Sequence, residues 1–196
     1  MEIGLGAFIK FANASPRRRP RIAREITEQV RSEYDPATDF WRPVRQAISR
    51  DRKTSRDGEA LRQLVLGAPP RRRPSFEEIR DRWGDVAARW DAAGYAHSTP
   101  THVDVGGLQV RLNPLFSEQW GDGHMEAAHL YFNKEELRPE TVQGIQHLLT
   151  RDTHPSEIEP VFIDMRRALT VPAVSFTDSM DDWLSGLGYE FRRLAA

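Results

Sequence analysis

The chain has 196 residues and a formal net charge of −1, with 39% hydrophobic and 29% charged residues, a composition that excludes a disordered protein. No apolar run approaches the ~20 residues of a membrane-spanning helix, so we predict no membrane contact. The absence of cysteine excludes disulfides, thiolate metal sites and a cysteine nucleophile. No basic leader precedes the apolar residues at the N-terminus, so we predict no signal peptide and a cytoplasmic location.

The small net charge hides an uneven distribution along the chain. Residues 1–100 carry 20 basic and 14 acidic side chains, whereas residues 101–196 carry 8 basic and 15 acidic side chains. This polarity is typical of two parts that dock on each other, or of a basic face offered to a partner. We predict a basic, mainly helical part over residues 1–97 and an acidic sheet-containing part over residues 98–196, joined by one continuous core.

The first third of the chain predicts short helices separated by polar or proline-rich connectors. Apolar residues within 8–11 indicate a short buried helix or strand. Ile22, Ile26 and Val30 recur every four residues, which is the spacing of one face of a helix. Helices are predicted over residues 21–33, 39–50 and 59–66, with a polar loop over residues 50–58.

A capping box predicts the start of the next helix. The Ser75 side chain can accept a hydrogen bond from the backbone N–H of Glu78, and Glu78 can reach back to the backbone of Ser75. From Phe76 to Trp90 the large apolar residues recur at helical spacing, until Gly94 ends the pattern. Aromatic side chains on one helix face are typical of a core, so we predict that this stripe covers a sheet. The stripe consists of Phe76, Ile79, Trp83, Val86, Ala87 and Trp90.

Two glycines, at positions 106 and 107, join two segments of alternating apolar and polar residues, Thr101–Val105 and Leu108–Leu112. A two-residue turn of this kind needs positive φ angles, which glycine adopts without a Cβ clash. The turn also fixes the register, which pairs His102 with Arg111. We therefore predict a β-hairpin whose apolar face is covered by helices.

The rest of the chain predicts further strands and two helices. Pro114 ends the hairpin, and Gly188 is predicted to stop the last helix. Strands are predicted over residues 115–120, 124–132, 161–170 and 173–176, and helices over residues 139–151 and 178–187. Segregated elements of this kind are typical of the α+β class. The predicted fold is an N-terminal helical part packed on a mostly antiparallel sheet of four to six strands, with two further helices.

Two arginine clusters precede predicted helix starts, where free backbone N–H groups also favour anions. Arginine binds phosphate oxygens in a bidentate manner, so the clusters are candidate polyanion-binding sites. The alternative is a pair of solvated connectors, because arginine supplies 25 of the 28 basic residues and no nucleic-acid-binding motif accompanies the clusters. The candidate residues are Arg17, Arg18, Arg19, Arg21, Arg71, Arg72 and Arg73.

Four polar residues are candidates for catalysis. His102, Asp104 and Arg111 share the polar face of the predicted hairpin, and such a set can transfer protons or bind an anion. Asp164 joins them if its strand lies beside the hairpin. Any solvent-facing hairpin presents a similar polar face, so a surface without catalytic function is the alternative.

The segment from His124 to His129 superficially resembles a metal-ligand motif. On a strand, His124 and Glu126 share a face while His129 lies on the opposite face, so we predict no metal site. The chain has no dinucleotide-binding, P-loop or nucleophile-elbow motif, and we predict no cofactor.

The absence of a catalytic motif and the uneven charge favour a non-enzymatic protein that binds a macromolecule, with another protein preferred over nucleic acid as the partner. One alternative is a hydrolase or nuclease-like enzyme that uses the four polar candidates. The other alternative is nucleic-acid binding through the arginine clusters. The sequence leaves the oligomeric state open.

Overall fold

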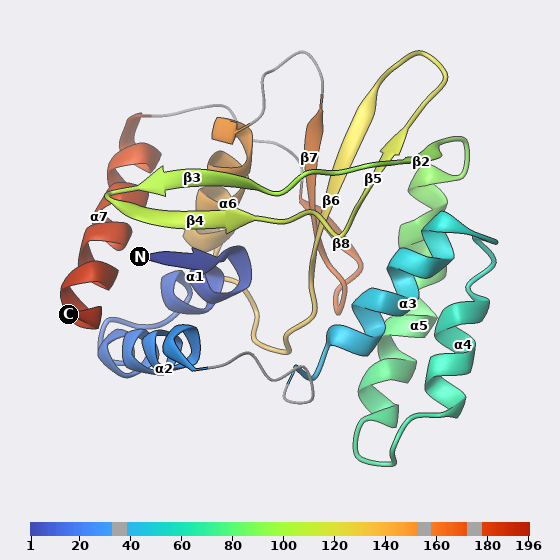
Figure 1. The fold of residues 1–196 in the computed structure, drawn as a ribbon, viewed down its shortest axis with the longest axis horizontal. Helices are drawn as coiled ribbons and strands as arrows, with labels where there is room; N and C mark the ends of the chain where they lie inside the picture. Colours follow the sequence, from blue (N-terminus) through green and yellow to red (C-terminus); the bar gives the residue numbers. More distant parts are fainter. Residues whose placement is uncertain (33–38, 153–157, 172–177) are drawn as a thin grey trace.

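The structure, a computed structural model, describes residues 1–32, 39–152, 158–171 and 178–196 and confirms the α+β class (Figure 1). Five helices come first along the chain, after one short strand, and two more helices lie in the C-terminal half. The α-helices are α1 (Leu5–Ala12), α2 (Arg19–Arg31), α3 (Arg42–Lys53), α4 (Glu59–Leu66), α5 (Arg73–Ala87), α6 (Pro139–Asp152) and α7 (Asp178–Ala195).

The strands form a small sheet in the order β1-β4-β3 and a larger sheet in the order β2-β5-β6-β7-β8. A 3-10 turn, η1 (Ala88–Trp90), extends α5 before the second strand. The strands are β1 (Glu2–Gly4), β2 (Gly94–Ala96), β3 (Thr101–Val105), β4 (Leu108–Leu112), β5 (Phe116–Gln119), β6 (Met125–Tyr131), β7 (Glu159–Asp164) and β8 (Leu169–Val171).

The glycine-linked hairpin forms with the predicted register. Strands β3 and β4 pair antiparallel, with His102 opposite Arg111. Gly106 and Gly107 have φ angles of +57° and +80°, the positive values that the turn requires. Strand β1, which the sequence did not predict, adds in parallel to the other side of β4.

The larger sheet is antiparallel except for the pairing of β6 with β7. Helix α6 connects these two parallel strands, because parallel neighbours need a crossover. The predicted strand 161–170 is in fact split into β7 and β8 by a turn in which Ala168 has a φ angle of +47°. The predicted edge strand 173–176 lies outside the described residues.

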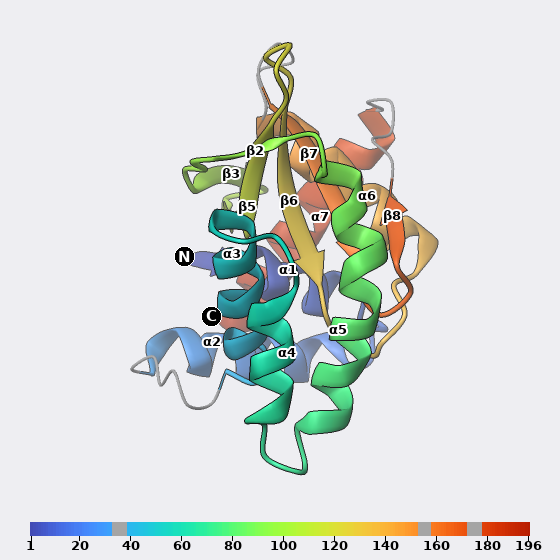
Figure 2. The same cartoon turned by 90° about the vertical axis from the view of Figure 1, so that its right-hand side faces the viewer.

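Buried apolar side chains form two clusters. The helices that contribute to them lie on opposite faces of the larger sheet (Figure 2). The first cluster joins α1, α2, the hairpin, α6 and α7, and the second joins α3, α4 and α5. Phe162 of β7 belongs to the first cluster, while its neighbours Val161 and Ile163 belong to the second. The stripe that contains Trp83 and Trp90 is buried, but it covers the larger sheet and not the hairpin.

The hairpin is covered instead by α7, which continues through Gly188 to Ala195 and does not end at residue 187. A Cβ atom on Gly188 would lie 1.7 Å from the carbonyl oxygen of Val105, and one on Gly106 would lie 2.2 Å from that of Ser185. The hairpin turn thus rests directly on the backbone of the helix, and glycine is required on both sides of this contact.

Other boundaries differ from the predicted ones for local reasons. Helix α5 begins at Arg73, with Pro74 in its first turn, so the predicted capping box does not form, and Glu78 pairs with Arg166 instead. Helix α3 runs to Lys53, into the predicted loop, and buries Arg52 against Glu118 of β5 with 2.7 Å between Arg52 Nε and Glu118 Oε1.

Within the described residues, no helix combines the length and the apolar character of a transmembrane segment.

Candidate functional site

A cleft of about 980 Å³ lies between the helices of the two clusters. Residues of α1 and α2 line one side, residues 39–41 and α3 line the other, and β6 lies between them (Figure 1). Aromatic rings, three cationic side chains and several amide or hydroxyl groups make up the described lining. This volume is at the upper end of the range of small-molecule sites, so the cleft has room for a larger occupant such as a chain segment.

Beyond Phe116, none of the described strands pairs with the side of β6 that β5 has left, and this open edge forms part of the cleft lining. The pairing of β5 with β6 ends at Phe116 opposite Ala128, and the backbone N–H of Leu115 donates the last hydrogen bond to the carbonyl of Ala128. Pro114 has no N–H with which to continue the ladder. Backbone groups alternate in direction along a strand, so the N–H and C=O of Leu130 face the side on which β5 has ended.

The imidazole of His129 lines the cleft and is only 6% exposed. Within the described part of the chain, no group forms a hydrogen bond with its ring. Burial lowers the pKa of His129 to about 4, so the ring is neutral near pH 7 and offers one donor and one acceptor. Burial also raises the pKa of the neighbouring Tyr131 to about 12, and its hydroxyl donates to the carbonyl of Glu135 at 2.9 Å.

An aromatic wall stands beside the open edge. The half-buried ring of Trp41 stacks on Phe132 with 5.5 Å between centroids, and Phe40 contacts Trp41 edge-on at 4.8 Å. The guanidinium of Arg166 lies 5.2 Å from the centre of the Trp41 ring, and its Nε donates to the carbonyl of Phe132 at 2.8 Å. These contacts fix the orientation of Trp41 and leave part of its surface accessible from the cleft.

Two of the three cationic side chains in the lining form ion pairs with carboxylates, and the third contacts an aromatic ring. Lys10 Nζ lies 2.9 Å from a carboxylate oxygen of Glu25, and Arg45 pairs with Asp39. Lys53 Nζ instead lies 5.1 Å from the centre of the Tyr95 ring, and no carboxylate of the described residues pairs with it. Among the described lining residues, Lys53 is therefore the cation best placed to attract a carboxylate.

The buried ion pairs of Glu118 hold α3 against the larger sheet. Glu118 accepts hydrogen bonds from Arg52 Nε at 2.7 Å and from Arg56 at 2.9 Å, and its side chain is fully buried. In addition, the Ser49 hydroxyl donates to the carbonyl of Leu115 at 2.9 Å. These bonds position the α3 side of the cleft, which carries Lys53.

The four predicted catalytic residues lie in two different sheets. His102, Asp104 and Arg111 are exposed on the hairpin, where His102 pairs with Glu2 at 3.3 Å. Asp104 accepts from the backbone N–H of Gly107 at 2.9 Å and so stabilises the turn.

Asp164 is buried at the end of β7, where it accepts from the backbone N–H of Arg166 at 3.0 Å and pairs with Arg167 at 2.7 Å. These bonds hold the turn that leads to β8. None of the four predicted catalytic residues lines the cleft.

The two predicted arginine clusters lie far apart, at the start of α2 and at the α4–α5 connection (Figure 1). In the first cluster, Arg19 pairs with Glu190 at 2.7 Å and Arg18 with Glu135 at 3.6 Å. In the second cluster, Arg72 lies over the ring of Phe40 at 5.2 Å and Arg73 donates to the carbonyl of Ala68 at 3.2 Å. The seven arginines do not form one continuous basic surface.

Sequence reasoning did not identify the cleft, because separate segments of the chain build it. Lys53 falls in the predicted polar loop over residues 50–58, and His129 was considered only for the strand face on which it lies. One available signal was the rarity of lysine, since two of the three lysines of the chain, Lys10 and Lys53, line the cleft.

No protein-family model, no curated protein and no solved structure matches this chain.

Proposed function

We propose that this protein is a non-enzymatic cytoplasmic binding protein that holds an extended, acidic segment of another polypeptide in the cleft. The observation that carries this proposal is the open edge of β6 beside the imidazole of His129, which has no hydrogen-bond partner among the described residues. An extended peptide adds to an exposed sheet edge through main-chain hydrogen bonds, and pockets along the edge select its side chains.

The cleft offers a defined partner for each part of such a segment. The backbone N–H and C=O of Leu130 pair with the main chain of the segment, and the neutral ring of His129 donates or accepts one further hydrogen bond. The accessible part of Trp41 receives an apolar or aromatic side chain, and Lys53 attracts a carboxylate. Residues 129–131 of β6, which extend beyond the pairing with β5, offer an edge about 10 Å long at the usual rise per residue.

Peptide selection tests the proposal directly. Random peptides displayed on phage are selected on the immobilised full-length protein, and the dissociation constants of the selected peptides are measured by fluorescence anisotropy. We expect acidic peptides whose affinity falls by about tenfold or more in Lys53→Glu, because the substitution places like charges opposite each other. Lys134→Glu is the matched control, since Lys134 is an exposed lysine outside the lining.

Amide hydrogen exchange then locates the bound peptide. If the segment pairs with β6, exchange of the Leu130 amide slows on binding, because its N–H becomes hydrogen-bonded. The proposal is wrong if selection yields no binding peptide. It is also wrong if the selected peptides bind Lys53→Glu as tightly as the wild type, or leave exchange at Leu130 unchanged.

A further inference from the structure

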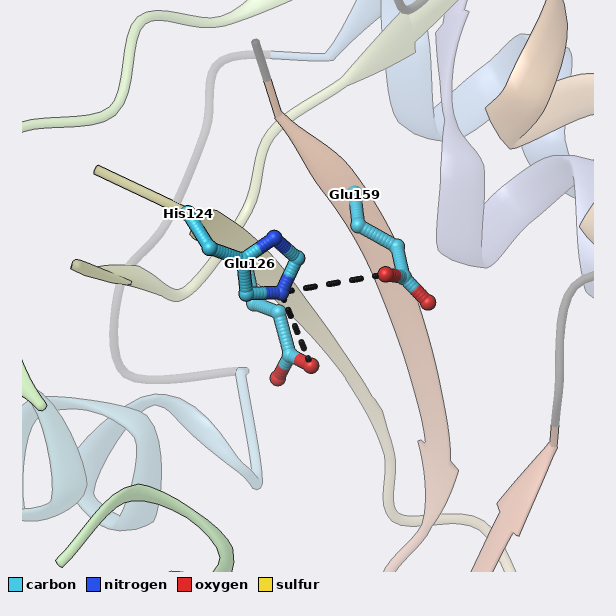
Figure 3. Close-up of side chains that lie close together, drawn as sticks. All are labelled: His124, Glu126 and Glu159. Atoms are coloured by element: carbon cyan, nitrogen blue, oxygen red, sulfur yellow. Dashed lines mark ion pairs between the residues drawn. The ribbon is translucent and has the colours of Figure 1, made fainter. Parts of the chain in front are cut away.

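Three metal-ligating side chains meet at the opposite end of β6 from the cleft (Figure 3). The parallel pairing of β6 with β7 places Glu126 directly beside Glu159, so their side chains share a face of the sheet. His124 precedes Glu126 by two residues and reaches toward the same face. Its Nε2 atom lies 3.7 Å from Oε1 of Glu126 and 3.8 Å from Oε2 of Glu159.

We propose that His124, Glu126 and Glu159 bind one divalent transition-metal ion, with Zn²⁺ as the species best suited to them. Zinc takes imidazole nitrogen and carboxylate oxygen at about 2.0–2.2 Å, which places tetrahedral ligand atoms about 3.3 Å apart. The three ligand atoms already lie within 4.8 Å of one another. His124 and Glu159 are 43% and 48% exposed, so both can move the remaining distance.

The hydrogen bonds of Glu126 leave an acceptor position open on the side that faces His124. A carboxylate has about four lone-pair positions, two on each oxygen. Oε2 of Glu126 accepts from Arg89 Nε at 2.8 Å and from the Trp90 indole at 2.7 Å, whereas Oε1 accepts only from Arg89, at 2.5 Å, among the described residues. Oε1 is also the oxygen nearest His124, so the open position points toward the proposed ion.

Arg89 and Trp90 would act as the supporting partners of this metal ligand. Their three hydrogen bonds fix a carboxylate that is only 4% exposed, and such partners orient metal ligands in known sites. The bond to Glu126 raises the pKa of Arg89, so this partner keeps its charge at every pH of interest. Three protein ligands leave the fourth zinc position open to water or another molecule.

The chain provides a matched control for this geometry. His102 pairs with Glu2 at 3.3 Å and is exposed to a similar degree as His124. This pair belongs to the small sheet, and among the described residues it lacks the second carboxylate that completes the His124 cluster. If an exposed histidine–glutamate pair were enough to bind the ion, both His102 and His124 would bind it. If the third ligand is needed, only the His124 cluster binds the ion.

Isothermal titration of the tag-free protein with ZnCl₂ tests the proposal. We expect one saturable site in the wild type, an affinity lower by about tenfold or more in His124→Ala and in Glu159→Gln, and no change in His102→Ala. The replaced side chains are exposed, so the variants should keep the circular dichroism spectrum of the wild type. The ring of Trp120 lies 5.0 Å from that of His124, and the Trp90 indole is hydrogen-bonded to Glu126, so bound Co²⁺ should also quench tryptophan fluorescence, and Trp120→Phe should reduce that quenching.

Absence of saturable Zn²⁺ binding in the wild type would overturn the proposal. Equal affinity in the wild type and in His124→Ala, or an equal loss in His102→Ala, would also overturn it. Because the cluster and the cleft share no residue, these results are independent of the peptide experiment.

Discussion

At the scale of single residues, the buried His129 of the cleft should make the free energy of unfolding depend on pH. Burial lowers its pKa from 6.5 to about 4 in the folded protein, while the unfolded chain keeps the ordinary value. Between these two values the unfolded state binds a proton that the folded state does not bind. The contribution of His129 to stability is therefore complete above pH 6.5 and falls by about 3 kcal/mol as the pH drops to 4.

The substitution His129→Asn removes this titration. Urea unfolding between pH 7 and pH 4 should show a smaller loss of unfolding free energy in the variant than in the wild type, by up to about 3 kcal/mol. The carboxylates contribute equally to both proteins, so the difference reports on His129. His97→Asn is the control because the His97 side chain is exposed, and it should keep the wild-type profile. Parallel profiles for wild type and His129→Asn would contradict the assignment.

Individual residues were predictable where a local rule fixes them. The φ angles of Gly106 and Gly107 and the pairing of His102 with Arg111 followed from turn geometry alone. The positions of His129 and Lys53 did not, because their surroundings are supplied by residues distant in the sequence. The candidate site predicted from the sequence therefore contained the hairpin residues and missed the cleft.

At the scale of elements, the contact between the hairpin turn and α7 predicts opposite effects for two glycines of the same helix. A Cβ atom at residue 188 would overlap the Val105 carbonyl, so Gly188→Ala should destabilise the protein by about 1–3 kcal/mol or more. A Cβ atom at Gly186 would meet no atom within 4 Å. Gly186→Ala should therefore stabilise the protein by up to about 1 kcal/mol, through helix propensity alone.

Chemical denaturation of both variants checks this pair of predictions. Since the two substitutions are chemically identical and lie within one helical turn of each other, their difference isolates the contact with the hairpin. A gain of stability in Gly188→Ala would show that the turn does not rest on the helix backbone.

Most elements were predictable from periodicity, but several of their ends were not. Helix α4 has the predicted bounds, and the strands β3 and β4 do as well. The predicted capping box at Ser75 does not form because the helix begins at Arg73, with Pro74 in its first turn. Glu78 pairs with Arg166 instead. Gly188 was interpreted as a stop because the packing partner that requires glycine there lies in another part of the chain.

At the scale of the whole molecule, the two clusters should unfold together because β7 contributes to both. Phe191 is fully buried in the first cluster and contacts Phe11 edge-on at 5.0 Å. In a Trp183→Phe background, the tryptophans that remain are those packed with the second cluster. Adding Phe191→Leu should lower the midpoint of thermal unfolding equally by tryptophan fluorescence and by far-ultraviolet circular dichroism.

If the fluorescence midpoint stayed unchanged while the circular dichroism transition split, the two clusters would be independent folding units. Leu66→Ala is a suitable control because Leu66 is 71% exposed, and it should leave both midpoints close to their original value.

The α+β class followed from the order of helices and strands along the sequence, whereas the arrangement around two clusters did not. The stripe from Phe76 to Trp90 showed that a helix face would be buried, but no local signal indicates which sheet it covers. The order of strands in the larger sheet and the parallel position of β1 also depend on long-range pairings.

The close contact between the hairpin turn and α7, at Gly106 and at Gly188, restricts how this sequence can evolve. Replacing either glycine by a larger residue requires a shift of the turn or of the helix, so neither glycine can be substituted without a compensating change elsewhere. Proteins that retain the arrangement should carry the smallest residue at both places even when little else is shared. A glycine pair in a hairpin turn, with a further glycine inside a C-terminal helix, is a pattern by which distant relatives could be sought.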